Sequence, residues 1–392
     1  MNRRTFLVNT SAAMLGSQLL ASHHQLRRVA VIGHTGRGNY GHGLDVVWRK
    51  VPGVDIVGVA DPDEEGLKEA LKRLDTDHGY RDYRTMLKHA QPEFVSVAPR
   101  HPDQHSEMTL AAIEAGAKGI YVEKPFCRSP EEADRIIEAA DRAGTRIAVA
   151  HRNRYHPVLP VIKKLVQDGG IGRLLEMQGY GKGDQRGGSE DLWVLGSHVV
   201  NLFQYLGGQP QSCSAIVLQD GKPATAEDVV EGNENLGLLA GNEIHARWLL
   251  SSGLTCTYQT FTNDGSKGKG YSLHLIGTQG TITIKIDGDP FAWLISGSPA
   301  NPQSRQNERI PISSAGPGRP EPHPDNIVSV YNHVAAILDL MDAVDNDRPP
   351  LCDARQGALA VEMICSAFES HRNYGAFVSF PLSERGNPFA KW

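Results

Sequence analysis

The strongest constraint on the fold is an alternation of short apolar runs and helical patterns between residues 27 and 155. The apolar runs are RRVAVIG (27–33), VDIVGVADPD (54–63), PEFVSVAP (92–99), KGIYVEKP (118–125) and TRIAVAHR (145–152). Strands that alternate with helices form parallel sheets with right-handed crossovers. Uninterrupted apolar strands are buried on both faces. This region therefore predicts a doubly wound parallel sheet.

The alternation of apolar runs and helical patterns ends at about residue 155. A helical segment (156–170) and a glycine-rich loop (181–193) precede an apolar helix over 194–208. Alternating strand-like stretches follow, with hairpin-type turns at Ser251–Gly253 and Gly277–Gly280. Helices predicted over 326–346 and 354–370 close the chain. We therefore expect residues 153–392 to form an α/β domain whose open, predominantly antiparallel sheet is covered by helices on one face, after a first domain at residues 27–152.

Composition excludes several classes of protein. The chain has 392 residues and a net charge of −5, without a basic block that would indicate nucleic-acid binding. It has no apolar stretch long enough to span a bilayer. Its five cysteines include no CxxC pair, which disfavours a zinc ribbon or thioredoxin-like site. An oxidising compartment would permit Cys213–Cys256 or Cys352–Cys365 bonds, but buried free thiols are the favoured interpretation.

The first 26 residues resemble a twin-arginine export signal rather than part of the fold. Arg3 and Arg4 precede Thr5-Phe6-Leu7 and a mildly apolar segment rich in Ala, Leu and Ser. We expect a periplasmic or secreted protein without membrane association after export. Whether the segment is cleaved stays open, because no small-x-small triplet precedes His23.

A glycine-rich loop between the first strand and a predicted helix suits a bound dinucleotide, whose pyrophosphate sits at a helix N-terminus. The second strand ends in Asp61, where a carboxylate binds ribose hydroxyls and repels a 2′-phosphate, so NAD is favoured over NADP. Asp61 could instead, or in addition, cap a helix. The loop residues assigned to the cofactor are Gly33, Thr35 (in place of the second glycine), Gly36, Arg37 and Gly38.

Lys124 stands at the carboxyl end of a predicted parallel strand, where ligands bind such sheets. A lysine that is partly desolvated beside a cofactor cation has a lowered pKa and can share a substrate proton. The alternative is a surface lysine at a strand end. Pro125 makes the turn rigid and suggests a cis peptide. Residues assigned to the nicotinamide side are Pro99, Arg100, His101, His105, Glu123 and Lys124.

The strand–EKP–helix element, the glycine loop, the P-x-x-H strand end, the IGTQGTI hairpin and the closing SERGNP resemble the Gfo/Idh/MocA oxidoreductases over about residues 27–385. The export signal, APRHPDQH and EDLWVLGSH look like a secreted branch. The resemblance implies a Rossmann domain, an open-sheet second domain that often serves in oligomer contacts, and therefore a homodimer or homotetramer. It also implies that Lys124 assists proton transfer and that a histidine, matching His198, acts as acid/base.

His198 has independent support, because imidazole titrates near neutrality and can accept an alcohol proton. Capping or packing in the helix is the alternative. The chain departs from the family pattern of an aspartate four residues before this histidine and another three after it: Val194 and Asn201 stand there. This departure puts the usual proton relay in doubt. We expect Asp191 to substitute, with Glu190 nearby.

Arginines and lysines supply candidate substrate contacts: Arg152, Arg154, Lys182 and Arg186. Lys182 and Arg186 could equally be solvated loop charges. His101 and His105 have an i,i+4 spacing, but no acidic third ligand is near in sequence, so no metal is expected.

Three functions remain open. The favoured one is NAD-dependent oxidation of a secondary hydroxyl of a sugar, glycoside or cyclitol, with His198 and Lys124 handling the proton. A second uses transient oxidation and elimination to cleave a glycoside without net redox change; a cofactor retained after export would suit it. The third is a non-catalytic NAD- and sugar-binding protein, slightly favoured by Val194 and Asn201. Net NADH production separates the first two.

Overall fold

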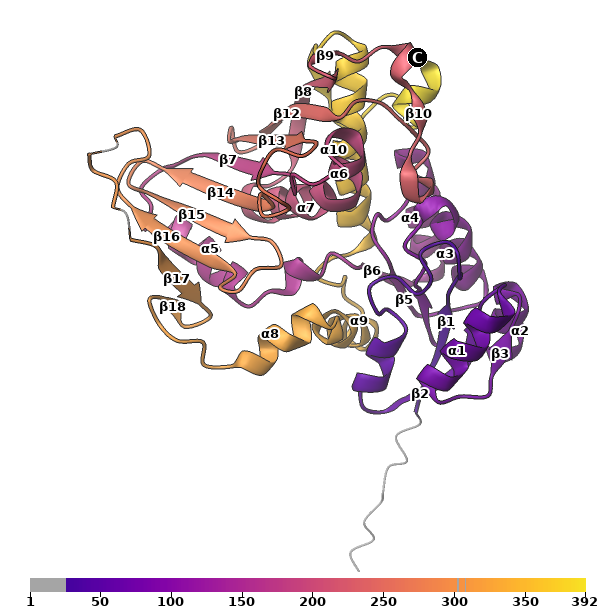
Figure 1. The fold of residues 1–392 in the computed structure, drawn as a ribbon. Helices are drawn as coiled ribbons and strands as arrows, with labels where there is room; N and C mark the ends of the chain where they lie inside the picture. Colours follow the sequence, from indigo (N-terminus) through magenta and orange to yellow (C-terminus); the bar gives the residue numbers. More distant parts are fainter. Residues whose placement is uncertain (1–25, 302, 307) are drawn as a thin grey trace, which may run out of the picture.

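A six-stranded parallel sheet forms the centre of the first domain (Figure 1). The computed structural model describes residues 26–301, 303–306 and 308–392, so the predicted export signal lies outside the described residues apart from Leu26. The sheet order β3-β2-β1-β4-β5-β6 confirms the doubly wound arrangement. Its strands are β1 (Arg27–Ile32), β2 (Val54–Ala60), β3 (Gly79–Tyr80), β4 (Phe94–Val97), β5 (Gly119–Val122) and β6 (Arg146–Val149).

Helices cover both faces of this sheet, as its fully buried strands require. One face packs against α2 (Tyr83–Ala90), α3 (His105–Glu114) and α4 (Pro130–Ala143). The other face packs against α1 (Glu64–Leu74), the 3₁₀ helix Val46–Lys50 and α9 (Val334–Asp345). Because α9 comes from the last part of the chain, the first domain is completed by residues far from it in sequence.

The second domain contains an open sheet in which every pairing except β7–β13 is antiparallel, as expected. The Ser251–Gly253 and Gly277–Gly280 turns join neighbouring antiparallel strands, which confirms both predicted hairpins. The main path contains β18 (Gly316–Pro317), β17 (Ile310–Ser313), β16 (Ala292–Ser296), β15 (Gly280–Lys285), β14 (Ser272–Gly277), β7 (Leu174–Tyr180), β13 (Thr255–Phe261), β12 (Glu243–Leu250), β8 (Pro210–Gln219) and β19 (Val378–Ser379), with β9 (Lys222–Pro223) beside β8.

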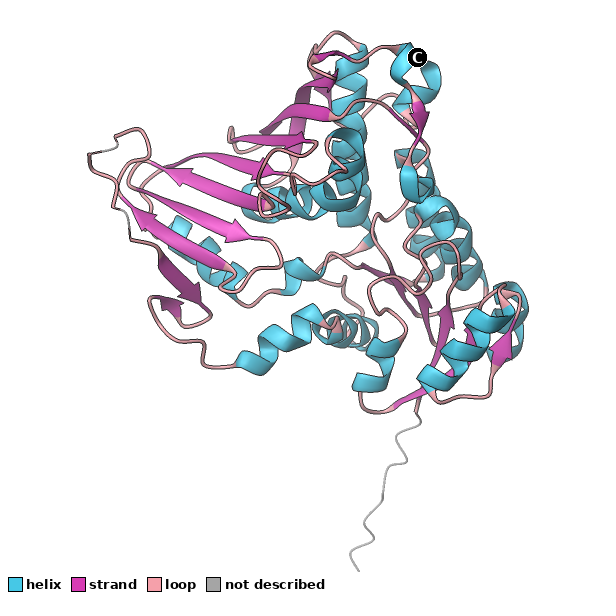
Figure 2. Ribbon diagram, viewed as in Figure 1, coloured by secondary structure: helices cyan, strands magenta, loops and turns pink. Residues whose placement is uncertain are grey.

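Helices lie along one side of this sheet (Figure 2), and the alternating burial of β12 and β13 shows that the side chains of only one face are fully covered. The covering helices are α5 (Val158–Gln167), α7 (Ser197–Gly207) and α10 (Ala354–Arg372). The short helix α6 (Gly188–Asp191) and a π-helical turn (Leu192–Gly196) lead into α7. A small hairpin of β10 (Val230–Glu231) and β11 (Leu238–Leu239) stands apart from the large sheet.

Two predicted helices differ in the structure. The helix predicted over 326–346 is two helices, α8 (Pro324–Tyr331) and α9, which meet at 83°. The break is at His333, whose φ of 66° is incompatible with a continuous right-handed helix. The helix expected after the glycine loop is also absent: turns continue to Asp45, and only the 3₁₀ helix Val46–Lys50 follows.

The five cysteines are all buried and free, as favoured from the sequence. Within the described part of the chain, no single helix is long and apolar enough to cross a membrane, although α8 and α9 together reach the required length and composition.

We expect α9 to contribute strongly to stability through its packing on the first sheet. Leu340 is fully buried there, whereas Leu338 is 48% exposed on the same helix. Leu340→Ala should lower the free energy of unfolding by about 2–5 kcal/mol because it leaves a cavity. Leu338→Ala should change it by less than about 0.5 kcal/mol. Urea denaturation of both variants checks this, and equal losses would contradict the packing.

Candidate active site

The glycine loop crosses the carboxyl end of β1, and Asp61 anchors it from the end of β2. Asp61 is fully buried and accepts hydrogen bonds from the Thr35 amide (3.1 Å), the Thr35 hydroxyl (2.8 Å) and the Asp63 amide (3.0 Å). The helix cap of α1 is Asp63, not Asp61, so the capping alternative for Asp61 is wrong. Gly33 ends the strand against the ring of Tyr40. The acid thus fixes the loop as well as standing where a ribose is expected.

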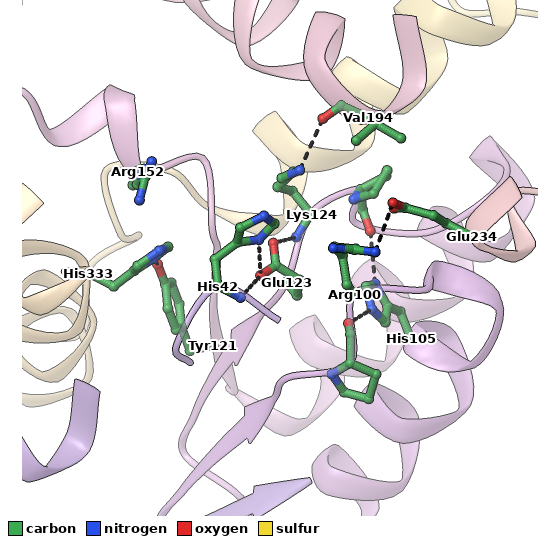
Figure 3. A network of polar contacts seen from close by, with 12 residues as sticks. His42, Arg100, His105, Tyr121, Glu123, Lys124, Arg152, Val194, Glu234 and His333 are labelled. Carbon is green, nitrogen blue, oxygen red and sulfur yellow. Dashed lines mark hydrogen bonds and ion pairs between the residues drawn. The ribbon is translucent and has the colours of Figure 1, made fainter. Parts of the chain in front are cut away.

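Residues after β4 connect the two domains. Arg100 forms an ion pair with Glu234 (3.1 Å), and the Asn235 side-chain amide donates to His101 Nδ1 (3.2 Å). Glu234 and Asn235 belong to the connection between β10 and β11 in the second domain. Arg37 pairs with Asp103, which ties the glycine loop to the same segment. Figure 3 shows the Arg100–Glu234 pair beside the strand ends.

His105 is not free to bind a cofactor, contrary to its assignment from the sequence. It is fully buried at the start of α3, with Nε2 2.7 Å from the carbonyl oxygen of Pro99 and Nδ1 2.8 Å from that of Pro125 (Figure 3). Both ring nitrogens are therefore occupied. The imidazole ties the segments after β4 and β5 together, and Pro99 contributes to that link.

Glu123 is buried at the end of β5 and faces the glycine loop. Its carboxylate accepts from the His42 amide (3.0 Å) and lies 2.9 Å from His42 Nδ1; it also accepts from the Lys124 amide (2.8 Å). Burial alone would raise the pKa of Glu123, but the hydrogen bond and charge of His42 and the charge of Lys124 lower it overall. Glu123 is thus held as a carboxylate that positions the loop.

The side chain of Lys124 extends from the first domain to the second. Its Nζ donates to the carbonyl oxygen of Val194 at 3.0 Å, and the residue is only 4% exposed (Figure 3). Burial lowers the pKa of Lys124, an effect that the Glu123 charge opposes. The Lys124–Pro125 peptide is cis, as the sequence suggested. The surface-lysine alternative is therefore wrong.

The carbonyl that accepts from Lys124 belongs to the π-helical turn Leu192–Gly196. Such turns are wider than an α-helix and are frequent at functional sites. The next carbonyl, of Leu195, accepts from the Tyr271 hydroxyl at 2.7 Å. Val194, which stands where the family pattern has an aspartate, therefore contacts Lys124 through its backbone carbonyl.

His198 lies in the first turn of α7, four residues after Val194, whose carbonyl accepts from Lys124. It is 7% exposed, and its Nδ1 is buried without a hydrogen-bond partner among the described residues. Its ring meets that of His151 edge to face, with centroids 5.3 Å apart. Burial, followed by the positive charge of Lys124, lowers the pKa of His198 well below its usual range. The structure therefore brings together a neutral imidazole and a buried lysine from different domains.

Asp191 does not form the expected proton relay with His198, because its hydrogen bonds go to other residues. It is buried in the second domain, where it accepts from the hydroxyls of Tyr258 (2.8 Å) and Thr260 (2.6 Å) and from the Lys182 amide (3.3 Å). Burial raises the pKa of Asp191, although the Thr260 and Tyr258 hydrogen bonds oppose this rise. Its carboxylate is committed to holding the glycine-rich loop on β13.

The four predicted substrate residues separate into different environments. Arg152 donates to the Tyr331 carbonyl (2.9 Å) and pairs with Asp287 (3.0 Å), and its charge acts on His198. Arg154 is buried instead, its guanidinium 3.7 Å from the centre of the Tyr205 ring. In the glycine-rich loop, Arg186 and Lys182 both pair with Asp184.

Sequence reasoning missed several side chains of this site. His42 lies in the glycine-rich loop, His151 lies just after β6, and Tyr271 immediately precedes β14. His333 reaches the first domain from the bend between α8 and α9, where its Nδ1 lies 2.6 Å from the Tyr121 hydroxyl (Figure 3). A histidine at a strand end was a usable signal for His151, whereas nothing local indicated His333. No group of three metal-ligating side chains occurs within the described ranges.

Comparison with known protein families places this geometry in context. Residues 27–151 match the family model described as "Oxidoreductase family, NAD-binding Rossmann fold". Residues 163–378 match the family model described as "Oxidoreductase family, C-terminal alpha/beta domain". The chain belongs to the Gfo/Idh/MocA oxidoreductase family, and it is an NAD(P)-dependent dehydrogenase of that type with an NAD-binding Rossmann domain.

Individual relatives are dehydrogenases of sugars and cyclitols. The chain is 27% identical to D-apiose dehydrogenase of Paraburkholderia graminis over 63% of this chain and 69% of that protein. It is 25% identical to levoglucosan dehydrogenase of Pseudarthrobacter phenanthrenivorans over 58% of this chain and 64% of that protein. A structure of an inositol dehydrogenase homolog from Azotobacter vinelandii with NADH and myo-inositol superposes with a TM-score of 0.69 at 18% identity, covering 91% of this chain and 98% of that one.

The loop residues suit the dinucleotide. Gly36 has a φ of 86°, and no atom lies within 4 Å of the place where its Cβ would stand, so the backbone there is open to a ligand. Gly38 has a φ of 78° and packs directly against Arg100. The groups that would hold NAD are therefore the backbone around Gly36 and the Asp61 carboxylate, which contacts the neighbouring Thr35.

This contrast predicts different effects of alanine at the two glycines. Both substitutions place a side chain in the left-handed region, which costs roughly 1–2 kcal/mol. In Gly38→Ala the new Cβ would also stand 2.4 Å from the Cβ of Arg100. Without NAD, the Gly38→Ala variant should therefore be clearly less stable than the Gly36→Ala variant. Gly36→Ala should chiefly weaken NAD binding. Thermal unfolding with and without NAD separates the effects, and equal apo stability would contradict the packing.

Buried neutral histidines should make the protein acid-sensitive. Burial lowers the pKa of His151 to about 3 and those of His156 and His333 to about 4. In the unfolded chain these histidines take up protons near pH 6.5. The free energy of unfolding is therefore greatest above that pH and falls as the pH drops toward 4. Urea unfolding between pH 7 and 4.5 measures the slope. His156→Gln removes one titrating group and should make the slope shallower; a pH-independent stability would contradict the assignment.

Proposed function

We propose that the protein oxidises a secondary hydroxyl of a sugar, glycoside or cyclitol with NAD, using His198 as the acid/base and Lys124 as its assistant. The observation that carries this proposal is the buried Lys124, whose Nζ lies 3.0 Å from the carbonyl oxygen of Val194, four residues before His198. Burial lowers the pKa of both Lys124 and His198, and the charge of Lys124 lowers that of His198 further. The sugar and cyclitol substrates named for the relatives support the substrate class.

Each group has a distinct task in this proposal. Bound NAD accepts the hydride. His198 is neutral and accepts the hydroxyl proton, a step that contributes typically 10²–10⁴-fold. The Lys124 ammonium donates a hydrogen bond that lowers the energy of the developing alkoxide. Arg152, held by Asp287 and the Tyr331 carbonyl, is placed to orient the substrate.

Export and assembly belong to the proposal as well. Arg3 and Arg4 support twin-arginine export to the periplasm or beyond, with the cofactor loaded before transport. The incompletely covered face of the large sheet supports a homodimer or homotetramer.

The first experiment measures cofactor and redox balance together. Protein purified without added nucleotide is denatured, and the released material is analysed by chromatography. The protein is then incubated with NAD and levoglucosan, D-apiose, myo-inositol or scyllo-inositol while absorbance at 340 nm is followed. Net NADH is expected. Bond cleavage without net NADH would replace the dehydrogenase proposal with the redox-neutral one, and inertness of NAD-loaded protein toward all four would contradict the proposed substrate class.

Lys124→Met and His198→Asn test the assigned roles. Each should lower kcat by about 10²-fold or more while NAD still shifts the melting temperature, because neither removes the glycine loop. Lys164→Met, on an exposed lysine paired with Asp168, is the matched control and should keep full activity. Normal kcat in either site variant would rule out its proposed role.

A further inference from the structure

A buried set of polar side chains includes His151, whose ring contacts that of His198. His151 comes from the end of β6, Asn201 from α7 one turn after His198, and Cys352 from the segment before α10. All three are at most 2% exposed. Polar groups buried this deeply normally serve a defined hydrogen-bonding purpose.

The hydrogen bonds of this set define the protonation of His151. The Asn201 amide nitrogen lies 3.6 Å from Cys352 Sγ and can only donate, so the sulfur accepts there. Burial raises the pKa of Cys352 to about 12, so it is a thiol. Its remaining hydrogen is available to His151 Nδ1 at 3.8 Å. With that thiol hydrogen directed at Nδ1, His151 carries its own proton on Nε2.

The two imidazoles meet edge to face, without a hydrogen bond between them. Nε2 of His151 and Nδ1 of His198 are both fully buried without a partner among the described residues, and the rings meet at 85°. Nε2 of His198 is not among the buried unpartnered atoms, so it is the ring nitrogen available to a substrate. Contact with His151 limits the rotation of the His198 ring that would turn Nε2 away.

We propose that His151, supported by Cys352 and Asn201, is the positioning residue for His198 and takes the place of the carboxylate partner that this chain lacks at position 194. This inference rests on the proposed function of His198. A carboxylate partner would stabilise the protonated imidazole; a neutral imidazole orients the ring without doing so. His198 would then hold the substrate proton only briefly and remain an active base at acidic pH.

The charged side chains around His151 and His198 favour the neutral form of both rings. Lys124, Arg152 and His42 face His198. Lys124 and Arg154 face His151, with Glu123 the one opposing charge. Burial and this positive surrounding both favour the uncharged forms of the two rings.

The test measures the protonation of His198 without any substrate. Diethyl pyrocarbonate modifies neutral imidazole, so its rate at His198, followed by peptide mass spectrometry from pH 4.5 to 8, reports the pKa of that ring. In the wild-type protein the rate should stay high below pH 6. His151→Asp should move the midpoint upward by roughly one to three pH units, because a neighbouring carboxylate stabilises the protonated ring.

Enzyme kinetics supply the second readout. His151→Asn should lower kcat by roughly 10- to 100-fold through misplacement of His198, with NAD affinity unchanged. His156→Asn is the matched control: His156 is equally buried in the same segment but stacks on Phe291 at 3.7 Å, away from His198. It should leave both the modification midpoint and the pH profile of kcat unchanged.

An unchanged modification midpoint in His151→Asp, or kcat within twofold of wild type in His151→Asn, would overturn the proposal. If His151→Asp fails to fold, Cys352→Ala decides instead: it removes the hydrogen bond that fixes His151, and an unaltered kcat and pH profile would overturn the proposal. If no polyol is oxidised by the wild-type protein, the proposed function fails, but the modification experiment still reports on the two histidines.

Discussion

The buried ammonium of Lys124 is the constraint on which the site depends. A charge removed from water at this depth is tolerated only with hydrogen-bonding partners, and one partner, the Val194 carbonyl, belongs to the other domain. The π-helical turn presents that carbonyl, and Tyr271 holds the next one. The same turn leads into α7, so satisfying the lysine also brings His198 to it. A single hydrogen bond thus links the placement of both Lys124 and His198 to the docking of the two domains.

The first domain and the position of Lys124 were predictable because they follow from short-range patterns. Continuous apolar strands, Gly144 after α4 and Ser129 before it are local signals, and parallel strands necessarily end at one edge. The bend at His333 was not predictable, since residues 326–346 have an uninterrupted helical period. The Tyr121–His333 contact joins residues 212 positions apart, which local propensity cannot show.

Residue types in the site were easier to predict than their partners. Asp61 and His105 were assigned to the cofactor and Asp191 to a proton relay, whereas their hydrogen bonds in the structure go to Thr35, to two carbonyls and to two hydroxyls, respectively. These partners come from strands and loops that only the tertiary fold assembles. His151 stood at a predicted strand end and could have been proposed, whereas its link to Cys352 spans 201 residues.

The return of α9 to the first sheet has a consequence for the modularity of the chain. Ala336, Ile337 and Leu340 belong to a helix that packs on β5 and β6, whose residues lie roughly 190–220 positions earlier in the chain. A fragment ending at residue 152 would therefore carry an exposed apolar sheet face. The Rossmann domain is therefore not an independent folding unit. A gene fusion or limited proteolysis that separates it from the C-terminal helices would produce a fragment that aggregates. During synthesis, its final packing must wait until nearly the whole polypeptide has left the ribosome.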